Sequence, residues 1–354
     1  MTDWLVDAVM LPDGTEPGSR WLTSSGWTEQ RVPDAVALPG RFALPGLVDA
    51  HSHVSFSDGD GALVFVDRSG AEAHRERYAR DGVAIVRDAG GAPDVVLSLP
   101  RTAGRPFVVA AGRHLAPPGM YFEGVHLPVE ADDVVEVALG DLAAGATWAK
   151  LVADFPSAAA RALGPGAAPE QTYDLDVVRR LIDAVHGAGG RVAAHVTTPL
   201  ASALVSLGID SIEHGTALDE ATVDEMAARG TAWTPTLCAV LSAAPDAPPE
   251  RLRVVADRRE RFTHLLPYAI ARGVPVLTGS DVVGTIPREI ALLVECGVAP
   301  GDALRAATAS AMRFLGADAE VAPASVVTYE ADPRDDPEVV RQPAAVVIGG
   351  VLVR

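Results

Sequence analysis

The sequence has almost no lysine, little cysteine and no long apolar run. Lys150 is the only lysine among 354 residues, and the other 28 of the 29 basic residues are arginine. Cys238 and Cys296 are too few for a disulfide framework and lack the spacing of a CxxC motif. No stretch approaches the roughly 18 uncharged apolar residues of a membrane span, and the first residues are acidic where a signal peptide is basic. We therefore expect a cytoplasmic protein without a membrane partner.

The sequence also has few basic residues relative to acidic ones. The chain carries 47 acidic against 29 basic residues, a formal net charge of −18, and no segment gathers its arginines. Such a chain repels a phosphate backbone, which excludes nucleic acid as an expected partner. The length allows two domains or one large α/β barrel with an accessory part. Composition leaves open whether chains assemble into a homo-oligomer.

From Leu38 onward, short apolar runs of strand length alternate with longer, alanine-rich stretches. We predict eight strands, at residues 46–54, 83–87, 107–111, 147–152, 191–196, 211–214, 232–237 and 274–279. Helices are predicted at residues 71–80, 132–144, 174–188, 201–207, 219–228, 251–271, 286–296 and 302–315. Alternation of this kind is typical of a parallel sheet, and eight strands favour a (β/α)8 TIM barrel over a doubly wound open sheet.

The two ends of the chain follow a different pattern. Short apolar pieces broken by Asp13-Gly14 and Ser25-Gly26 precede the first long strand, and β-like runs return after Val326, with Gly349-Gly350 as a hairpin signal. We predict that residues 1–44 and 320–354 form one small β-sandwich domain. The barrel is then expected over residues 45–319.

Six polar side chains stand within or just after the predicted barrel strands. These residues are His51, His53, Lys150, His195, His214 and Asp281. Side chains two apart in a strand point to the same side, so the His51 and His53 imidazoles both face the interior. The carboxyl ends of barrel strands carry the active sites of barrel enzymes, whereas buried polar groups without hydrogen bonds are costly. We therefore expect the six groups to converge on one functional site.

This set of residues predicts a divalent metal site. Neutral imidazoles and a carboxylate suit Zn²⁺ and its first-row neighbours. An ammonium would be repelled by such ions, so Lys150 is expected to be neutral or chemically altered. An unprotonated lysine amine can add CO2 to form a carbamate, whose two oxygens bridge two metals, and arginine offers no such route. The alternative is that a single residual lysine fell by chance on a barrel strand.

The motif from Leu44 to His53 resembles the first-strand signature of the amidohydrolase superfamily. Three further motifs resemble its imidazolonepropionase-like and prolidase-like branch: residues 82–88, 212–215 and 278–281. The resemblance spans residues 38–315. Because imidazolonepropionases lack a lysine at the position of Lys150, the chain resembles the binuclear group with a carboxylated lysine.

The resemblance implies a role for each of the six residues. His51 and His53 would bind the more buried metal, His195 and His214 the second, and Lys150 as a carbamate would bridge both. Asp281 would bind the first metal and act as the catalytic residue that moves a proton from the metal-activated water to the leaving amine. Two divalent ions, with Zn favoured, and CO2 on Lys150 are the implied cofactors.

Substrate contacts are predicted in the segment after the third strand, residues 112–126. Tyr121 or His126 would polarise the scissile carbonyl, and Arg113 would meet a carboxylate. The alternative is an ordinary surface loop. Trp233, Thr234 and Thr236 on the seventh strand are further pocket candidates.

Three functions fit these predictions. The first is a metal-dependent hydrolase that cuts a carbon–nitrogen bond, in an amide, a cyclic amide or an N-acyl group, of a small molecule. The second is a metallopeptidase of the same superfamily, either an Xaa-Pro dipeptidase or a carboxypeptidase. The third is a metal-binding scaffold without catalysis.

Overall fold

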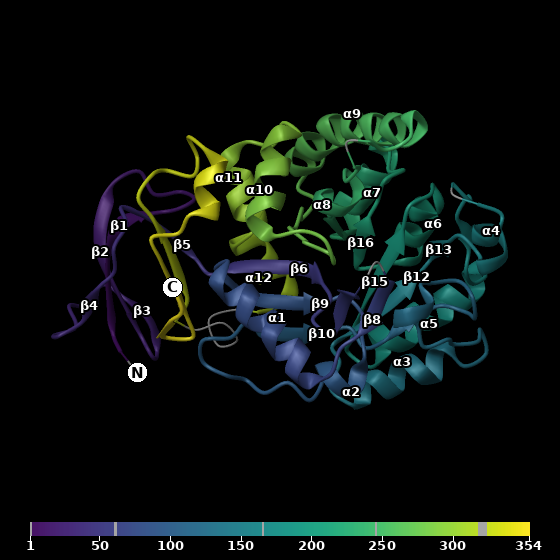
Figure 1. The fold of residues 1–354 in the computed structure, drawn as a ribbon, viewed down its shortest axis with the longest axis horizontal. Helices are drawn as coiled ribbons and strands as arrows, with labels where there is room; N and C mark the ends of the chain where they lie inside the picture. The colour runs from purple at the N-terminus through teal and green to yellow at the C-terminus, as the bar shows by residue number, and fades with distance from the viewer. Residues whose placement is uncertain (1, 60–61, 165, 245, 318–323) are drawn as a thin grey trace.

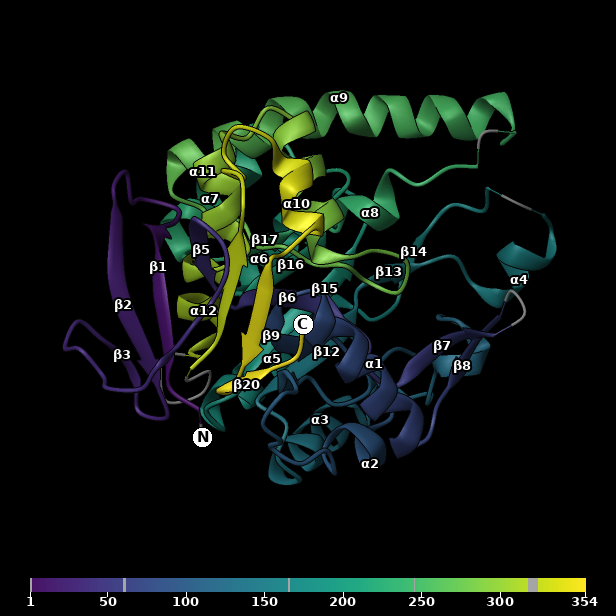
Figure 2. The ribbon, with the colours of Figure 1, turned by 60° about the vertical axis from the view of Figure 1, so that its left-hand side comes forward.

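The protein combines a sheet built from both ends of the chain with a larger region of alternating strands and helices (Figure 1, Figure 2). The computed structural model describes residues 2–59, 62–164, 166–244, 246–317 and 324–354. The fold class is α/β, as predicted from the alternating pattern. Within the described ranges, no helix has both the length and the apolar character needed to cross a membrane.

Seven of the eight predicted strands are confirmed. They are β6 (Leu47–Ser52), β9 (Val83–Asp88), β10 (Phe107–Ala110), β12 (Trp148–Val152), β15 (Arg191–Val196), β16 (Ser211–His214) and β17 (Ala232–Thr234). Together with β11 (His114–Leu115) they form two parallel sheets, β10-β9-β6 and β11-β12-β15-β16-β17. The Thr147 N–H donates to the Ala110 carbonyl at 3.1 Å and links the two sheets. All residues of β6, β9 and β12 are buried, which is typical of parallel strands.

The eighth predicted strand, residues 274–279, is not a regular strand. Pro275 has no N–H to donate, and a proline within a strand disrupts the ladder. The segment nevertheless pairs with β17 through an isolated parallel bridge to Trp233. The Asp281 N–H donates to the His51 carbonyl at 2.7 Å. Backbone hydrogen bonds thus continue from β17 through this segment to β6.

Helices connect the parallel strands at the predicted positions. They are α1 (Arg68–Arg80), α3 (Val134–Ala143), α5 (Leu175–Gly187), α6 (Leu200–Leu207), α7 (Glu220–Arg229), α9 (Pro249–Arg272) and α10 (Ile286–Glu295). The single helix predicted for residues 302–315 is wrong, because the structure has α11 (Pro300–Ala306) and α12 (Ala309–Leu315). Thr308 between them leaves the helical conformation, with φ −137° and ψ −102°, and its hydroxyl bonds to the Leu304 carbonyl.

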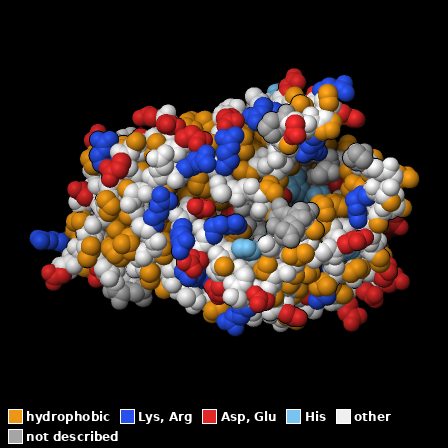
Figure 3. All heavy atoms as spheres, in the orientation of Figure 1, with side chains coloured by type: hydrophobic (Ala, Val, Ile, Leu, Met, Phe, Trp, Pro, Cys, Tyr) orange, Lys and Arg blue, Asp and Glu red, His pale blue; other side chains and the backbone are white. Residues whose placement is uncertain are grey.

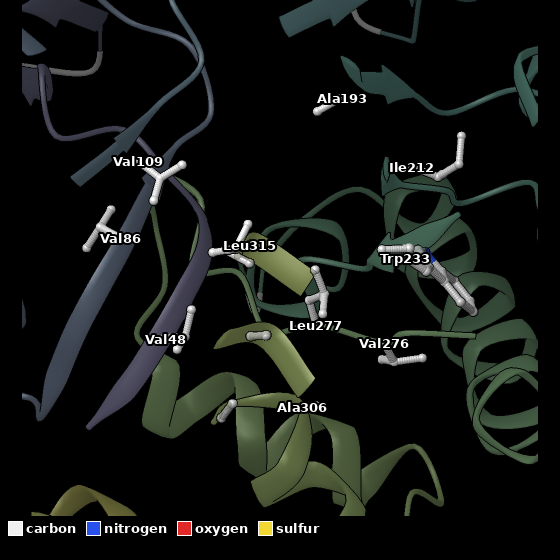
Figure 4. Packing of buried hydrophobic residues seen from close by; sticks show 14 of the residues in the cluster. Val48, Val86, Val109, Ala193, Ile212, Trp233, Val276, Leu277, Ala306 and Leu315 are labelled. Atoms are coloured by element: carbon white, nitrogen blue, oxygen red, sulfur yellow. The ribbon is translucent and has the colours of Figure 1, made fainter. Parts of the chain in front are cut away.

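Short helices and strands lie in the segments that connect the main elements. They are β7 (Phe56–Gly59), β8 (Ala62–Phe65), α2 (Pro93–Val96), η1 (Glu123–Val125), β13 (Asp154–Phe155), α4 (Ala158–Ala162), β14 (Glu170–Gln171), α8 (Leu237–Val240) and η2 (Pro337–Arg341). The main core lies between the strands and the helices, and Figure 4 shows Val48, Leu277 and Trp233 within it.

The two ends of the chain meet in one eight-stranded sheet of order β20-β19-β18-β5-β1-β2-β3, with β4 paired to β1. Its strands are β1 (Trp4–Met10), β2 (Pro17–Thr23), β3 (Gly26–Thr28), β4 (Val36–Ala37), β5 (Phe42–Pro45), β18 (Val326–Tyr329), β19 (Ala345–Ile348) and β20 (Val351–Leu352). The antiparallel pairing of β18 with β5 joins the ends. The sandwich arrangement and the division into domains stay predictions, and the boundary at 319/320 lies outside the described residues.

Candidate metal centre

A pocket of about 420 Å³ lies at the carboxyl ends of the central strands. Figure 3 shows it as a hollow in which histidine side chains are visible. Five of the six predicted ligands line this pocket: His51, His53, His195, His214 and Asp281. The strand ends meet here because the parallel strands all run toward the same end of the sheet, as the sequence pattern implied.

Three of these side chains form a tight group. One ligand atom each from His51, His214 and Asp281 lies within 4.8 Å of the others. His53 Nε2 is 3.5 Å from Asp281 Oδ1, and the His195 ring centroid is 4.5 Å from that of His214. The group takes one member from each predicted histidine pair. The division of the ligands between two metal positions therefore stays a prediction.

Three imidazoles are held from behind through Nδ1. The partners are Glu213 Oε2 for His51 at 2.6 Å, the Gly90 carbonyl for His53 at 2.7 Å, and Thr236 Oγ1 for His214 at 2.6 Å. Hydrogen bonds of this kind fix the tautomer and ring orientation of metal-binding histidines and leave Nε2 free as the ligand atom. The geometry of these three side chains thus fits a metal site.

The sequence analysis missed Glu213 and Arg87, which support this arrangement. Both are fully buried, and Arg87 Nη2 donates to Glu213 Oε1 at 2.6 Å. Burial acts to raise the pKa of Glu213, but the Arg87 guanidinium and the His51 side chain hold it well below its usual range. Glu213 is therefore an ionised carboxylate that accepts a hydrogen bond from the Nδ1–H of His51. Charged residues inside otherwise apolar strands were the available signal.

Burial keeps the candidate ligands in the form that binds metal. It lowers the pKa of His51 to about 4 and the pKa of His195 to about 4, and that of His214 lies well below its usual value. All three imidazoles are thus neutral near pH 7. For Asp281, burial acts to raise the pKa, yet the His53 side chain 3.5 Å away and the nearby His51 and His214 side chains hold it well below its usual value.

Two of these residues also adopt an unusual backbone conformation. His214 has φ 67° and Asp281 has φ 56°, in the left-handed region that side chains other than glycine rarely occupy. In Asp281, the N–H of Val282 donates to Oδ1 at 2.8 Å. Strained residues of this kind cluster at functional sites, because the surrounding structure holds them in place.

Lys150, the sixth predicted ligand, lies behind the pocket. Its side chain is buried on β12, and Nζ has no hydrogen-bond partner among the described residues. Burial lowers the pKa of Lys150 to about 8. A buried amine without a partner is costly, and a readily neutralised amine is the form that reacts with CO2. Lys150 therefore fits the predicted carbamate.

His114, which the sequence analysis did not single out, is the register neighbour of Lys150 on β11. It is buried, and neither ring nitrogen has a hydrogen-bond partner within the described ranges. Its ring centroid lies 4.5 Å from Tyr121 and 5.4 Å from His53. Asp88 Oδ1 is another buried atom that has no hydrogen-bond partner in the described part of the chain. The sequence carried no signal for His114, because its place beside Lys150 follows from the pairing of β11 with β12.

The predicted substrate-binding residues are separated. Tyr121 lines the pocket, and burial raises the pKa of its hydroxyl, so the group remains a donor. His126 Nε2 donates to the Ala116 carbonyl at 2.9 Å, and Arg113 forms an ion pair with Asp141 at 2.8 Å. Neither His126 nor Arg113 is among the described residues that line the pocket. Thr236 lies behind His214 instead of facing a substrate.

A sequence model of the amidohydrolase family matches residues 42–323. The chain belongs to this family. An uncharacterized protein of Mycobacterium tuberculosis (strain H37Rv) is 33% identical over 355 residues, which cover 96% of this chain and 93% of that protein. The imidazolonepropionase of Micrococcus luteus is a more distant relative, 26% identical over 245 residues, covering 56% of this chain and 55% of the relative.

Solved structures of prolidase and amidohydrolase type share the fold of this amidohydrolase. A Xaa-Pro dipeptidase with methionine bound in its active site superposes with a TM-score of 0.80, at 21% identity, over 99% of each chain. The likeness agrees with the sequence prediction of an amidohydrolase of the imidazolonepropionase-like and prolidase-like branch.

Proposed function

We propose that this amidohydrolase is a binuclear metal-dependent hydrolase that cuts the carbon–nitrogen bond of an amide, cyclic amide or N-acyl group in a small molecule. The observation that carries the proposal is the convergence of four histidines and Asp281 on one pocket, with the Lys150 amine behind it lacking a hydrogen-bond partner among the residues that the structure describes. His51, His53, His195, His214 and Asp281 would hold the ions, and Lys150 as a carbamate would supply further anionic oxygen ligands. The imidazole-rich set favours Zn.

Bound divalent ions would supply a nucleophilic water at neutral pH and polarise the carbonyl of the substrate. The chain's own residues carry the remaining tasks. Asp281, part-exposed in the pocket, takes a proton from the attacking water and delivers it to the leaving amine. The Tyr121 hydroxyl donates to the carbonyl oxygen as negative charge develops there. Glu213 holds the His51 ring through Nδ1.

The proposal includes the architecture expected from the sequence. The hydrogen bonds that run from β17 through residues 274–281 to β6, and from Thr147 to Ala110, support a closed (β/α)8 barrel. The terminal sheet would then form the separate β domain. A cytoplasmic location remains part of the proposal, supported by two free cysteines.

A Xaa-Pro dipeptidase activity is the second candidate. Its support is the similarity of fold to a Xaa-Pro dipeptidase over nearly the full chain. Dipeptides that end in proline, matched N-acyl amino acids and cyclic amides separate the two candidates. Turnover of the cyclic amides alone, with no dipeptide cleaved, would contradict the dipeptidase.

The test of the proposed function is metal content per chain, measured on protein purified without chelator and with CO2 present. We expect about two equivalents in the wild type and fewer in Lys150→Ala. A ¹³CO2-labelled sample should show a carbamate carbon that is absent from Lys150→Ala. One equivalent in both proteins would indicate a mononuclear enzyme, and none would favour the scaffold. An Asp281→Asn variant that retained full activity would contradict the assigned proton transfer.

A further inference from the structure

Two arginines of α9 line the pocket that holds the candidate metal ligands. Arg251 and Arg258 are seven residues apart, which is about two helical turns, so both face the same side of α9. Among the described residues that line the pocket, these are the only two with cationic side chains. Asp281 is the one carboxylate in the same described lining. The pocket therefore has a positive wall supplied by a single helix.

Each guanidinium is positioned by a backbone carbonyl of the segment after β17. Arg258 Nη1 donates to the Val240 carbonyl at 3.2 Å, and Arg251 Nη2 donates to the Ser242 carbonyl at 2.9 Å. Each bond uses one of the five N–H donors of a guanidinium. These bonds fix the position of the two side chains, and the other N–H groups of each guanidinium remain available to bind a ligand.

Neither guanidinium has a carboxylate within 4.0 Å in the described part of the chain. Other arginines of the same helix do, since Arg259 pairs with Glu295 at 3.1 Å and Arg272 with Asp224 at 2.6 Å. Burial and the nearby charge of Arg251 lower the pKa of Arg258. Two like charges close together are relieved by an anion between them, and arginine binds carboxylates with directed hydrogen bonds.

We propose that Arg251 and Arg258 form an anion subsite that binds a carboxylate of the substrate. This inference rests on the proposed function and narrows its substrates to amides that carry a free carboxylate. Apolar residues such as Phe122, Phe155 and Val282 line the same pocket and suit an apolar substituent. The carboxylate partner is thus assigned to α9, because Arg113 is already paired with Asp141 outside the described lining.

The experiment compares N-acetyl-L-amino acids of proline, leucine, methionine and phenylalanine with their primary amides, using metal-loaded protein. We expect Arg258→Gln to raise KM for the acids tenfold or more, with a smaller change in kcat, and Arg251→Gln, which is more exposed, to raise it about threefold. The amides should be poor substrates for the wild type and insensitive to both changes. Arg258→Lys should keep the positive charge and therefore raise KM for the acids less than Arg258→Gln does.

Arg253→Gln is the matched control, because Arg253 is exposed on the same helix and does not line the pocket. It should behave as the wild type with both substrate sets. Equal KM values for acids and amides in the wild type, or equal losses on both sets in Arg258→Gln, would overturn the anion subsite. A fall in kcat alone would overturn it too.

Failure of the proposed function gives a different result. If the wild type cleaves none of these compounds, calorimetric titration with the same N-acetyl amino acids and amides decides the subsite by itself. Preferential binding of the acids that Arg258→Gln abolishes and Arg253→Gln retains would support the subsite although the hydrolase proposal had failed for these compounds. Absence of acid binding by the wild type would overturn the subsite.

Discussion

Two groups of buried polar side chains behind the pocket, one around His51 and one around Lys150, differ in how they are paired. On the side of His51, Glu213 accepts hydrogen bonds from Arg87, from the Ser211 hydroxyl and from the His51 ring. On the side of Lys150, the amine and both nitrogens of His114 have no hydrogen-bond partner among the described residues. Both oxygens of Glu213 thus have hydrogen-bond partners, whereas the Lys150 amine and the His114 ring have none within the described ranges.

This difference distinguishes polar groups that stabilise the fold from polar groups that are available to bind a metal, a carbamate or a substrate. Buried polar groups are nearly always hydrogen-bonded, because leaving one unpaired costs free energy. On the side of His51, the Glu213 carboxylate and the His51 Nδ1–H meet that requirement within the chain, and their hydrogen bond fixes the imidazole. On the side of Lys150, the groups that lack a partner in the described part of the chain lower the stability of the fold, which is expected where groups bind a metal, a carbamate or a substrate. Four predictions test the contrast, from the largest expected effect to the smallest.

Arg87→Met should destabilise the protein by removing the buried ion pair between Arg87 and Glu213. It leaves the Glu213 carboxylate buried without its guanidinium, which lowers the free energy of unfolding by about 3–5 kcal/mol. Denaturant unfolding measures the loss. Arg75→Met is the matched control, since Arg75 is also buried but its partner Glu72 is part-exposed, so a smaller loss is expected. Equal losses in both variants would contradict a special role for the buried pair.

Lys150→Met should have the opposite effect on stability. It replaces a buried amine, which has no hydrogen-bond partner among the described residues, with an apolar side chain of similar length. We expect the free energy of unfolding of chelator-treated protein in CO2-free buffer to rise by about 1–3 kcal/mol. The same variant should bind less metal than the wild type. Destabilisation of the metal-free protein would show that the amine has a structural partner.

Thr236→Val should weaken metal binding without a comparable loss of fold. It removes the hydroxyl bonded to His214 Nδ1 and is expected to lower metal affinity about 10- to 100-fold, read by competition with a chelating dye. Thr231→Val is the control, because it also removes a buried hydroxyl, bonded to the Ile209 carbonyl, away from the pocket. A similar loss of affinity in Thr231→Val would contradict the assignment.

Glu289→Gln should change the pH dependence of stability. Glu289 is buried, and burial raises its pKa from 4.5 to about 7, although the Leu237 and Cys238 N–H groups donate to it. Between these values the folded chain holds a proton that the unfolded chain has released, so this group lowers stability as pH rises, by at most about 1.4 kcal/mol per pH unit.

Urea unfolding at a series of pH values from 4.5 to 7.5 measures that slope in wild type and Glu289→Gln. The variant should have the less negative slope over this window, and Glu250→Gln, an exposed position on α9, should match the wild type. Identical slopes in all three proteins would show that Glu289 does not titrate in this range.

Much of the pocket floor could be predicted from the sequence, and little of its surroundings could. His51, His195 and Asp281 were identified because polar residues at the ends of apolar strands meet in a parallel sheet. Pro275 made the last strand irregular, and Thr308 divided a predicted helix, since local backbone chemistry overrode the apolar pattern. The partners of Arg113 and His126 could not be predicted, because a loop side chain bonds to whatever packs beside it.

The sequence by itself determined the α/β alternation and the types of residues at the strand ends, because side-chain periodicity and strand direction are local properties of the chain. The tertiary structure decided which groups that lie far apart in the sequence form pairs. Glu213 meets His51 over 162 positions of sequence, and the packing of α9 brings Arg251 and Arg258 to the pocket. Such pairings depend on how elements pack in three dimensions, which no residue spacing along the chain specifies.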